Sequence, residues 1–265
     1  MHDGMLVIDC LVWVDTEASA VGIIYQHLLE YLSDYEFDAL VVAPCSRCDG
    51  SVDAANRTVA ELQRAAEGRV RALARLVPSD AAIAAGVAAM LDARAITGVI
   101  LDPVTDAYCI ADGTASNAVA TSTPEATPIV VVSGWPFVSE ALQVAEFSTH
   151  VAPRPVIMTN GGQLNISGLG QTDAHQALQA RPNLLIQTTG VYRDDFLQQC
   201  VSQYGTERVI YASGSPLFDP LLELARVTQS EFSRDTQVAL LGVNAQRVFN
   251  LNPPTRGSGG AREGW

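Results

Sequence analysis

The sequence contains no lysine, so all 16 of its positively charged side chains are arginines. Without a lysine amine the chain cannot form a Schiff base, which excludes pyridoxal-phosphate enzymes. The same absence excludes a P-loop, whose lysine contacts the bound phosphates, and a pair of metal ions bridged by a modified lysine. Several large classes of enzyme are therefore ruled out.

Negative charge is in excess, since the chain has 29 acidic residues against 16 arginines and a net charge of −13. Nucleic acids and anionic membranes attract basic surfaces, so we expect neither as a partner. The longest apolar runs, such as residues 129–132, are too short to cross a bilayer. No basic leader followed by an apolar stretch opens the chain, so we expect a cytoplasmic protein.

The five cysteines are an odd number and come without a secretion signal. This favours reduced thiols over a disulfide framework. Residues 252–265 are rich in glycine, proline and arginine, which predicts a disordered tail. We therefore expect one domain over residues 1–251, followed by a tail over residues 252–265.

Short runs of apolar, β-branched residues recur along the chain. Their apolarity is nearly continuous rather than alternating, which is typical of strands buried on both faces. The predicted strands are residues 6–13, 39–43, 70–77, 98–102, 128–133, 156–159, 184–188 and 209–213.

Helical periodicity fills the segments between these runs, for example at Val21, Ile24, Leu28 and Leu32. Eight strands alternating with helices predict an α/β fold with parallel pairing, most simply a single (β/α)8 TIM barrel. An open doubly wound sheet is the alternative, but no glycine-rich dinucleotide fingerprint follows the first strand. We also expect an extra C-terminal helix over about residues 230–249.

In such a barrel the chemistry lies where the strands end. Asp102 and Asp106 are the candidate catalytic residues there, because a buried aspartate with a raised pKa can act as a base. The alternative is that Asp102 organises a turn, and that the serine and threonine hydroxyls at the other strand ends form hydrogen bonds to nearby backbone groups. The polar residues at predicted strand ends, which could together line a metal-free pocket, are Asp102, Asp106, Ser133, Asn160, Thr188 and Ser213.

Metal-binding and nucleophilic residues are sparse at these strand ends. The four histidines lie at the terminus (His2) or in helical stretches (His27, His150 and His175), so no histidine is placed to activate a serine. Cys45 and Cys48 form a Cys-x-x-Cys pair after the second strand, and Cys109 is the other thiol expected nearby. We treat these three cysteines as weak candidates for a metal or redox site, against the alternative of thiols without a role.

Several segments match, in order and spacing, one known family. They are residues 5–13, 56–57, 68–78, 98–103, 128–136, 156–162, 208–220 and 244–247, of which 208–220 is the most specific. Together they resemble the amidohydrolase-related family of metal-dependent TIM-barrel hydrolases and decarboxylases. The resemblance covers residues 5–251 and implies the same barrel.

The resemblance also implies a metal site, but this sequence lacks its ligands. The positions of the family's four histidines and one aspartate are occupied by Leu11, Trp13, Val132, Thr159 and Gly214. Four of these side chains offer no ligand atom, and one neutral hydroxyl does not hold a transition metal. Gly214 also replaces the family's proton shuttle. We therefore expect a degenerate member without metal or other cofactor.

Trp13 and Trp135 fall near the former metal centre, where they either stack on a planar ligand or, as we favour, fill the space that the metal left. With Leu11 and Trp13 pointing inwards, Cys10 is expected to point outwards.

These expectations favour a non-catalytic protein that binds a protein partner in a homo- or hetero-oligomer, such as a metal-bearing relative. The alternatives are a metal-independent hydrolase or lyase with a rebuilt site, and a small-molecule binding module. The sequence names no substrate for any of them.

Overall fold

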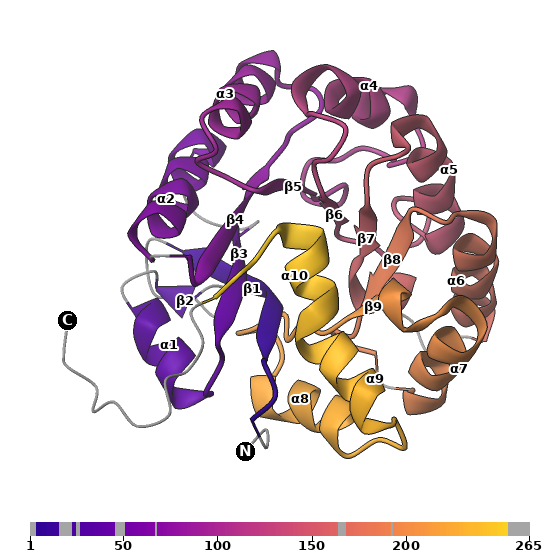
Figure 1. The fold of residues 1–265 in the computed structure, drawn as a ribbon. Coiled ribbons are helices and arrows are strands. Elements are labelled where there is room, and N and C mark those ends of the chain that lie inside the picture. Colours follow the sequence, from indigo (N-terminus) through magenta and orange to yellow (C-terminus); the bar gives the residue numbers. More distant parts are fainter. Residues whose placement is uncertain are drawn as a thin grey trace.

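Parallel strands pair in chain order around the molecule, in the sheet order β2-β1-β3-β4-β5-β6-β7-β8-β9. The computed structural model describes residues 4–15, 23–24, 27–45, 51–66, 68–163, 168–191 and 193–253. Within that part, helices form a ring outside the strands (Figure 1). The strands are β1 (Ile8–Asp15), β2 (Ile23–Ile24), β3 (Ala39–Pro44), β4 (Val70–Arg75), β5 (Gly98–Leu101), β6 (Ile129–Val131), β7 (Val156–Met158), β8 (Leu184–Gln187) and β9 (Val209–Ile210).

The helices of the ring start where strands and their loops end. Asp80, Asp112 and Asp219 cap three of them, since each carboxylate accepts hydrogen bonds from N–H groups of the first turn. The helices are α1 (Leu28–Asp34), α2 (Val52–Ala65), α3 (Ala81–Asp92), α4 (Gly113–Ser122), α5 (Ala141–Val151), α6 (Gly168–Ala180), α7 (Asp194–Tyr204), α8 (Pro220–Thr228), α9 (Arg234–Val238) and α10 (Asn244–Phe249), with short helical turns η2 (Thr159–Gly162), η3 (Thr206–Arg208) and η4 (Ala239–Val243).

The sheet closes between β1 and the segment that follows β9. Val12 of β1 bridges to Ser215, just beyond β9. Around that bridge, Trp13 donates its backbone N–H to the Ser215 carbonyl (2.9 Å), and Gly214 donates to the Leu11 carbonyl (2.9 Å). The expected α/β fold, a (β/α)8 barrel, is therefore confirmed, with β2 as a short strand outside the ring of eight.

The interior of the barrel is a packed apolar layer rather than a channel. Alternate residues of successive strands point inwards, while the other residues pack beneath the helices. The inner layer consists of Val41, Leu73, Ile100, Val130, Ile157, Leu185 and Ile210.

Strand β1 departs from simple alternation. Its pairing with β3 shifts between Asp9 and Val12, so Cys10 and Leu11 both join the inner apolar cluster. The expectation that Cys10 points outwards was wrong, because a bulge adds one residue to the strand at this point.

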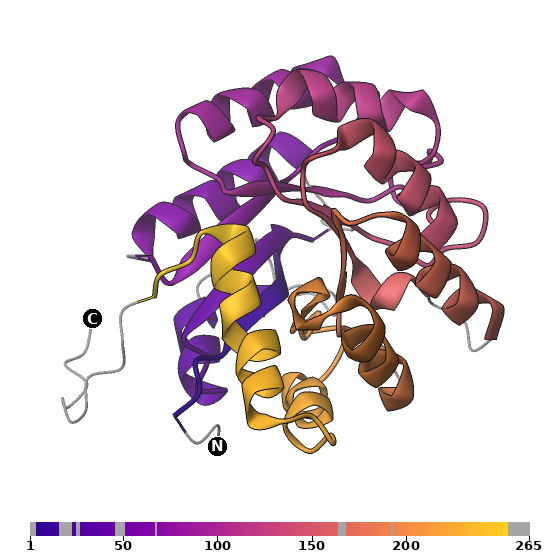
Figure 2. The ribbon, with the colours of Figure 1, turned by 45° about the vertical axis from the view of Figure 1, so that its right-hand side comes forward.

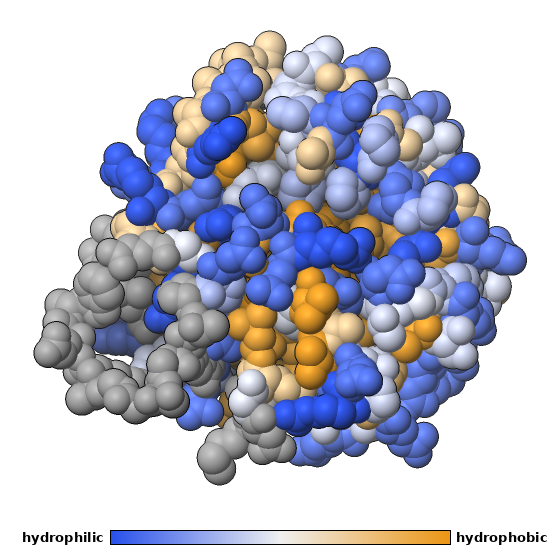
Figure 3. All heavy atoms as spheres, viewed as in Figure 1, coloured by the Kyte–Doolittle hydropathy of each residue, from blue (hydrophilic) through white to orange (hydrophobic). Residues whose placement is uncertain are grey.

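The C-terminal helix covers the end of the barrel at which the strands begin. Helical structure is continuous from residue 234 to residue 249 through α9, η4 and α10, and it begins after Ser233, whose hydroxyl caps the first turn. Figures 1 and 2 show α10 lying across this end. Phe249 and Leu251 pack there with the inner cluster, and Figure 3 shows a small apolar area in the lower centre of this face, next to hydrophilic residues.

Each of the eight predicted apolar runs overlaps an observed strand, and the predicted C-terminal helix is present but begins four residues later. No described helix is long and apolar enough to cross a membrane. The proposed tail lies outside the described residues from residue 254 onwards.

Candidate functional site

The mouth of the barrel is the end at which the strands finish, together with the loops that follow them. Leu11 and Trp13, the first two positions of the implied metal site, are buried in the inner apolar cluster. Trp13 is 7% exposed, so its indole fills the space beneath the mouth. A metal ligand at either position would have to replace a packed core side chain.

The next two positions follow β6 and β7. Val132 is partly buried and packs against the inner cluster. The Thr159 hydroxyl accepts hydrogen bonds from the backbone N–H of Ser133 (3.0 Å) and from Nδ2 of Asn160 (3.0 Å). Ser133 in turn donates its hydroxyl to the Thr159 carbonyl (2.7 Å). The hydroxyl of Thr159 therefore ties two loops together.

The fifth position, Gly214, has no room for a side chain. Its φ of +70° is a conformation that L-residues rarely adopt, and a Cβ there would lie 2.4 Å from Cγ2 of Thr189 and 3.2 Å from the Phe218 ring. The aspartate that the resemblance implies at this position does not fit the observed backbone.

The residues at the implied metal site therefore do not fit a metal ion. Their side chains are apolar, absent or already hydrogen-bonded, while divalent transition metals need nitrogen, oxygen or sulfur ligands. In the described part of the chain, no three histidine, cysteine, aspartate or glutamate side chains are grouped to hold a metal.

An ion pair that sequence reasoning missed lies beside the inner layer. Arg75, at the end of β4, pairs with Asp106 at 2.5 Å, and both side chains are almost fully buried. A second oxygen of Asp106 accepts from Nε of Arg75 (3.3 Å). An arginine at the inward position of a strand end was the available sequence signal.

Burial raises the pKa of Asp106, although hydrogen bonding and attraction to Arg75 act in the opposite direction. The phenol of Tyr108, whose pKa is raised by burial and by Asp106, is buried without a hydrogen-bond partner among the described residues. The carboxylate of Asp102 forms a separate set of hydrogen bonds. It accepts from the backbone N–H (3.2 Å) and from the hydroxyl (2.8 Å) of Thr105. That geometry is a local turn.

Ser213 and Thr188 form hydrogen bonds to neighbouring strands or to the segments that follow them. The Ser213 hydroxyl donates to Asp9 (2.5 Å) and accepts from the Ser215 N–H (3.0 Å), and the Tyr31 hydroxyl of α1 lies 3.3 Å from it. Thr188 donates to the Ala212 carbonyl (3.2 Å) and accepts from the Ala212 N–H (3.1 Å). Asn160 lies in the loop after β7, where its Nδ2 also donates to the Ser133 carbonyl (3.3 Å).

Among the described residues, the cysteines and histidines belong to no group of three side chains that could hold a metal, and His2 lies outside the described residues. Cys45 is buried after β3, Cys109 accepts from Nε2 of Gln143 (3.3 Å), and Cys48 lies outside the described residues. His27 precedes α1, and His150 is in the last turn of α5. His175 of α6 bonds the Tyr204 hydroxyl and the Gln199 side chain.

Large apolar side chains are exposed along part of the mouth. Eight of the nine that are exposed in the described residues lie on the loops after β6 and β9 or on the first turns of α5, α6 and α8. We call this set the apolar rim: Trp135, Phe137, Leu142, Leu169, Leu217, Phe218, Leu221 and Leu222. Trp135 thus lies in the rim and is 39% exposed, whereas Trp13 is in the core.

The strand order defines a (β/α)8 barrel, and several solved structures share this fold. The chain is similar to 5-carboxyvanillate decarboxylase from Sphingomonas paucimobilis, with a TM-score of 0.71 and 13% identity over 94% of this chain and 100% of that one. A probable 2-pyrone-4,6-dicarboxylic acid hydrolase from Acinetobacter baumannii gives a TM-score of 0.72 and 13% identity, over 93% and 100% of the two chains.

A third similar structure, the 5-carboxyvanillate decarboxylase of Novosphingobium aromaticivorans, is complexed with manganese. It gives a TM-score of 0.69 and 12% identity, over 94% of this chain and 97% of that one. No family model and no curated protein sequence matches the chain. At these identities, the likeness establishes the fold.

Proposed function

We propose that this chain is a degenerate amidohydrolase-like barrel that binds no catalytic metal and acts as a non-catalytic partner of another protein. The observation that carries the proposal is Gly214, because its backbone leaves no space for the ligand and proton shuttle that the resemblance implies there. The buried apolar side chains of Leu11 and Trp13 support the same conclusion.

The apolar rim supports the second half of the proposal. Exposed apolar patches mark sites of protein interaction, and here the exposed apolar residues lie at the end of the barrel that carries chemistry in active enzymes. A metal-bearing relative of the chain is the kind of partner that such a barrel would stabilise or regulate.

The test is an activity assay with added Mn²⁺ or Zn²⁺ on 5-carboxyvanillate and 2-pyrone-4,6-dicarboxylate, the substrates named for the similar structures. We expect no turnover, and no change in the thermal midpoint when the metal is added. Turnover that a chelator abolishes would contradict the proposal directly.

One observation favours a second candidate, a metal-independent hydrolase or lyase. The buried Arg75–Asp106 pair lies beside the unpartnered Tyr108 hydroxyl, which provides an acid, a base and a cation at one strand end. Activity that resists a chelator and is lost in Asp106→Asn would support this candidate over the first. The pair's burial, with side chains 8% and 7% exposed, argues for a structural role instead.

A further inference from the structure

A pocket of about 240 Å³ opens between the loops after β6 and β7. The loops and the first turns of α5 and α6 form its walls, so it lies at the mouth, beside the filled barrel interior. It is lined by Gly134, Pro136, Glu140, Ala141, Gly162, Gln163, Leu169, Gly170 and Asp173.

The charged residues that line this pocket are both acidic. Glu140 is held in place, because one carboxylate oxygen accepts from the Phe137 N–H (3.2 Å) while Gln143 accepts from the Glu140 N–H (2.9 Å). Asp173 on α6 makes no ion pair or hydrogen bond within the described residues and is partly exposed. No arginine is among the described lining residues.

Apolar side chains of the rim adjoin the pocket. Leu169 lines it and is 75% exposed, and Phe137, which is 85% exposed, directly follows the lining residue Pro136. Trp135 and Leu142 are likewise chain neighbours of lining residues. An acidic pocket surrounded by exposed apolar residues resembles the centre of a protein interface, where an anchor side chain enters a pocket.

The wider charge distribution points to the same kind of partner. Four helices begin at the mouth with an acidic residue at the N-cap, namely Asp80, Asp112, Glu140 and Asp219. The whole chain carries a net charge of −13. Complementary charge accelerates association and selects the partner, so a second copy of this acidic chain is disfavoured and a basic surface is favoured.

We infer that the pocket takes an arginine or lysine side chain from a segment of a partner protein, with apolar residues of that segment packing on Trp135, Phe137, Leu142 and Leu169. Asp173 is the carboxylate available to the incoming cation, and Glu140 adds a second negative charge. This inference rests on the proposed function, because it identifies the surface through which a non-catalytic barrel binds its partner.

The test is selection of random peptides displayed on phage against the full chain, followed by affinity measurements on synthetic versions of the enriched peptides. We expect a consensus in which one arginine or lysine is flanked by apolar residues. Because a charge-assisted hydrogen bond is lost, Asp173→Asn should weaken binding by roughly tenfold or more. Leu169→Ser should weaken it as well, and added salt should reduce the affinity of the wild type more than that of Asp173→Asn.

Matched controls lie at the opposite end of the barrel. Asp92→Asn changes an exposed aspartate at the end of α3, and Val243→Ser changes the exposed apolar residue of η4. Both variants should bind the peptides as the wild type does. Circular dichroism of all four variants separates loss of binding from loss of folding.

The inference would be overturned by no enrichment, by an uncharged consensus, or by binding that Asp173→Asn leaves unchanged. A consensus rich in aspartate or glutamate would also overturn it, because the helix N-termini would then be the binding groups. These failures are separate from failure of the proposed function, since turnover with added metal is measured without any peptide.

Discussion

Asp9 and Ser213 join the first and last strands of the barrel across 204 residues of chain, because one carboxylate oxygen of Asp9 accepts from the Ser213 N–H (2.8 Å) and the other from its hydroxyl (2.5 Å). Asp9 is fully buried, and burial raises its pKa to about 6 in spite of these hydrogen bonds. The Tyr31 hydroxyl of α1 donates to the same carboxylate (3.1 Å). The seam of the barrel is therefore closed by polar groups as well as by the sheet.

Ser213→Ala should destabilise the protein. The hydroxyl bonds the buried Asp9 carboxylate and accepts from the Ser215 N–H (3.0 Å), so its removal leaves buried groups unpaired at a cost of about 1–3 kcal/mol. Urea unfolding measures the loss. Ser148→Ala is the control, because that buried hydroxyl bonds only a carbonyl of its own helix and should change stability little. Equal losses of stability in the two variants would show that the hydrogen bonds of Ser213 contribute no more than those of a hydroxyl within a helix.

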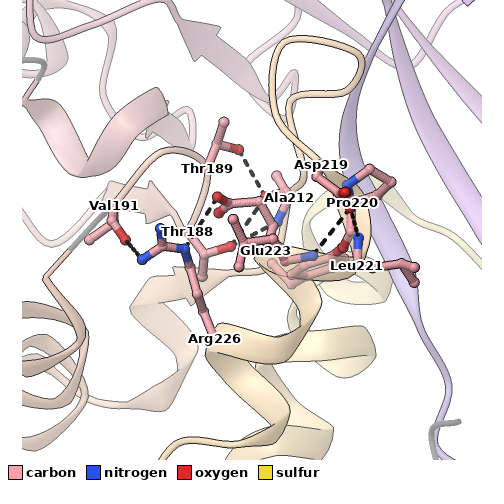
Figure 4. Close-up of polar contacts among 11 residues, drawn as sticks. Thr188, Thr189, Val191, Ala212, Asp219, Pro220, Leu221, Glu223 and Arg226 are labelled. Atoms are coloured by element: carbon pink, nitrogen blue, oxygen red, sulfur yellow. Dashed lines mark hydrogen bonds and ion pairs between the residues drawn. The ribbon is translucent and has the colours of Figure 1, made fainter.

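Glu223 should make stability depend on pH. Burial raises its pKa from 4.5 to about 7, while attraction to Arg226 acts in the opposite direction. Arg226 also donates to the Val191 carbonyl (2.8 Å), which ties α8 to the loop after β8 (Figure 4). The folded state therefore binds this proton more tightly than the unfolded state, and the stability it provides is lost as pH rises from about 4.5 through 7.

Glu223→Gln keeps the side chain neutral at every pH. Relative to wild type, the free energy of unfolding of the variant should rise across this window, by on the order of 2–3 kcal/mol. Asp9 titrates in both proteins, and its negative charge is one of the smaller causes of the raised pKa of Glu223, so the measured difference includes their mutual repulsion. Glu231→Gln, at an exposed position, is the control for the substitution itself and should change the free energy of unfolding little. If the difference in free energy of unfolding between Glu223→Gln and the wild type does not change with pH, the pKa of the Glu223 carboxyl is not raised.

Gly214→Ala should be destabilised by about 2–4 kcal/mol, because it combines a positive φ with a close approach to Cγ2 of Thr189. Thr189→Ser removes that methyl group but retains the hydroxyl that donates to the Ala212 carbonyl (3.0 Å). In a double-mutant cycle measured by urea unfolding, Thr189→Ser should therefore recover part of the loss. Strict additivity would mean that the steric account of this position is wrong.

Breaking the Arg75–Asp106 pair from one side should be costly. Arg75→Met leaves a buried carboxylate without its partner, and we expect a loss of about 3–5 kcal/mol. The double variant Arg75→Met/Asp106→Leu should be more stable than Arg75→Met, since it leaves no buried charge. Arg193→Met, in the exposed pair with Asp195, is the control and should have little effect. If the double variant is less stable than Arg75→Met, the ion pair contributes more to stability than the neutralisation of its own two buried charges.

The barrel could be predicted from the sequence because strands buried on both faces need nearly continuous apolar runs, as residues 156–159 and 184–188 show. The orientation of Cys10 could not be predicted, because a bulge in β1 shifts the alternation and depends on pairing with β3. The end of the C-terminal helix at Phe249 was predicted correctly, while its start depended on the Ser233 cap.

The candidate site was less predictable, because it depends on contacts between distant segments. The sequence indicated that Gly214 lacks a ligand, but only the fold brings Thr189 and Phe218 close enough to exclude one. Asp9 and Arg75 were read as parts of strands, since their partners Ser213 and Asp106 lie 204 and 31 residues away. The apolar rim likewise forms only when the fold brings the loops after β6 and β9 to the same end of the barrel.

The metal content of the purified protein tests the central claim most directly. The chain is produced in medium with added zinc and manganese, purified without chelators and analysed by inductively coupled plasma mass spectrometry, beside a Cys45→Ser/Cys48→Ser variant that removes the Cys-x-x-Cys pair. We predict far less than one metal ion per chain in both proteins. One ion per chain that persists in the cysteine variant would contradict the account.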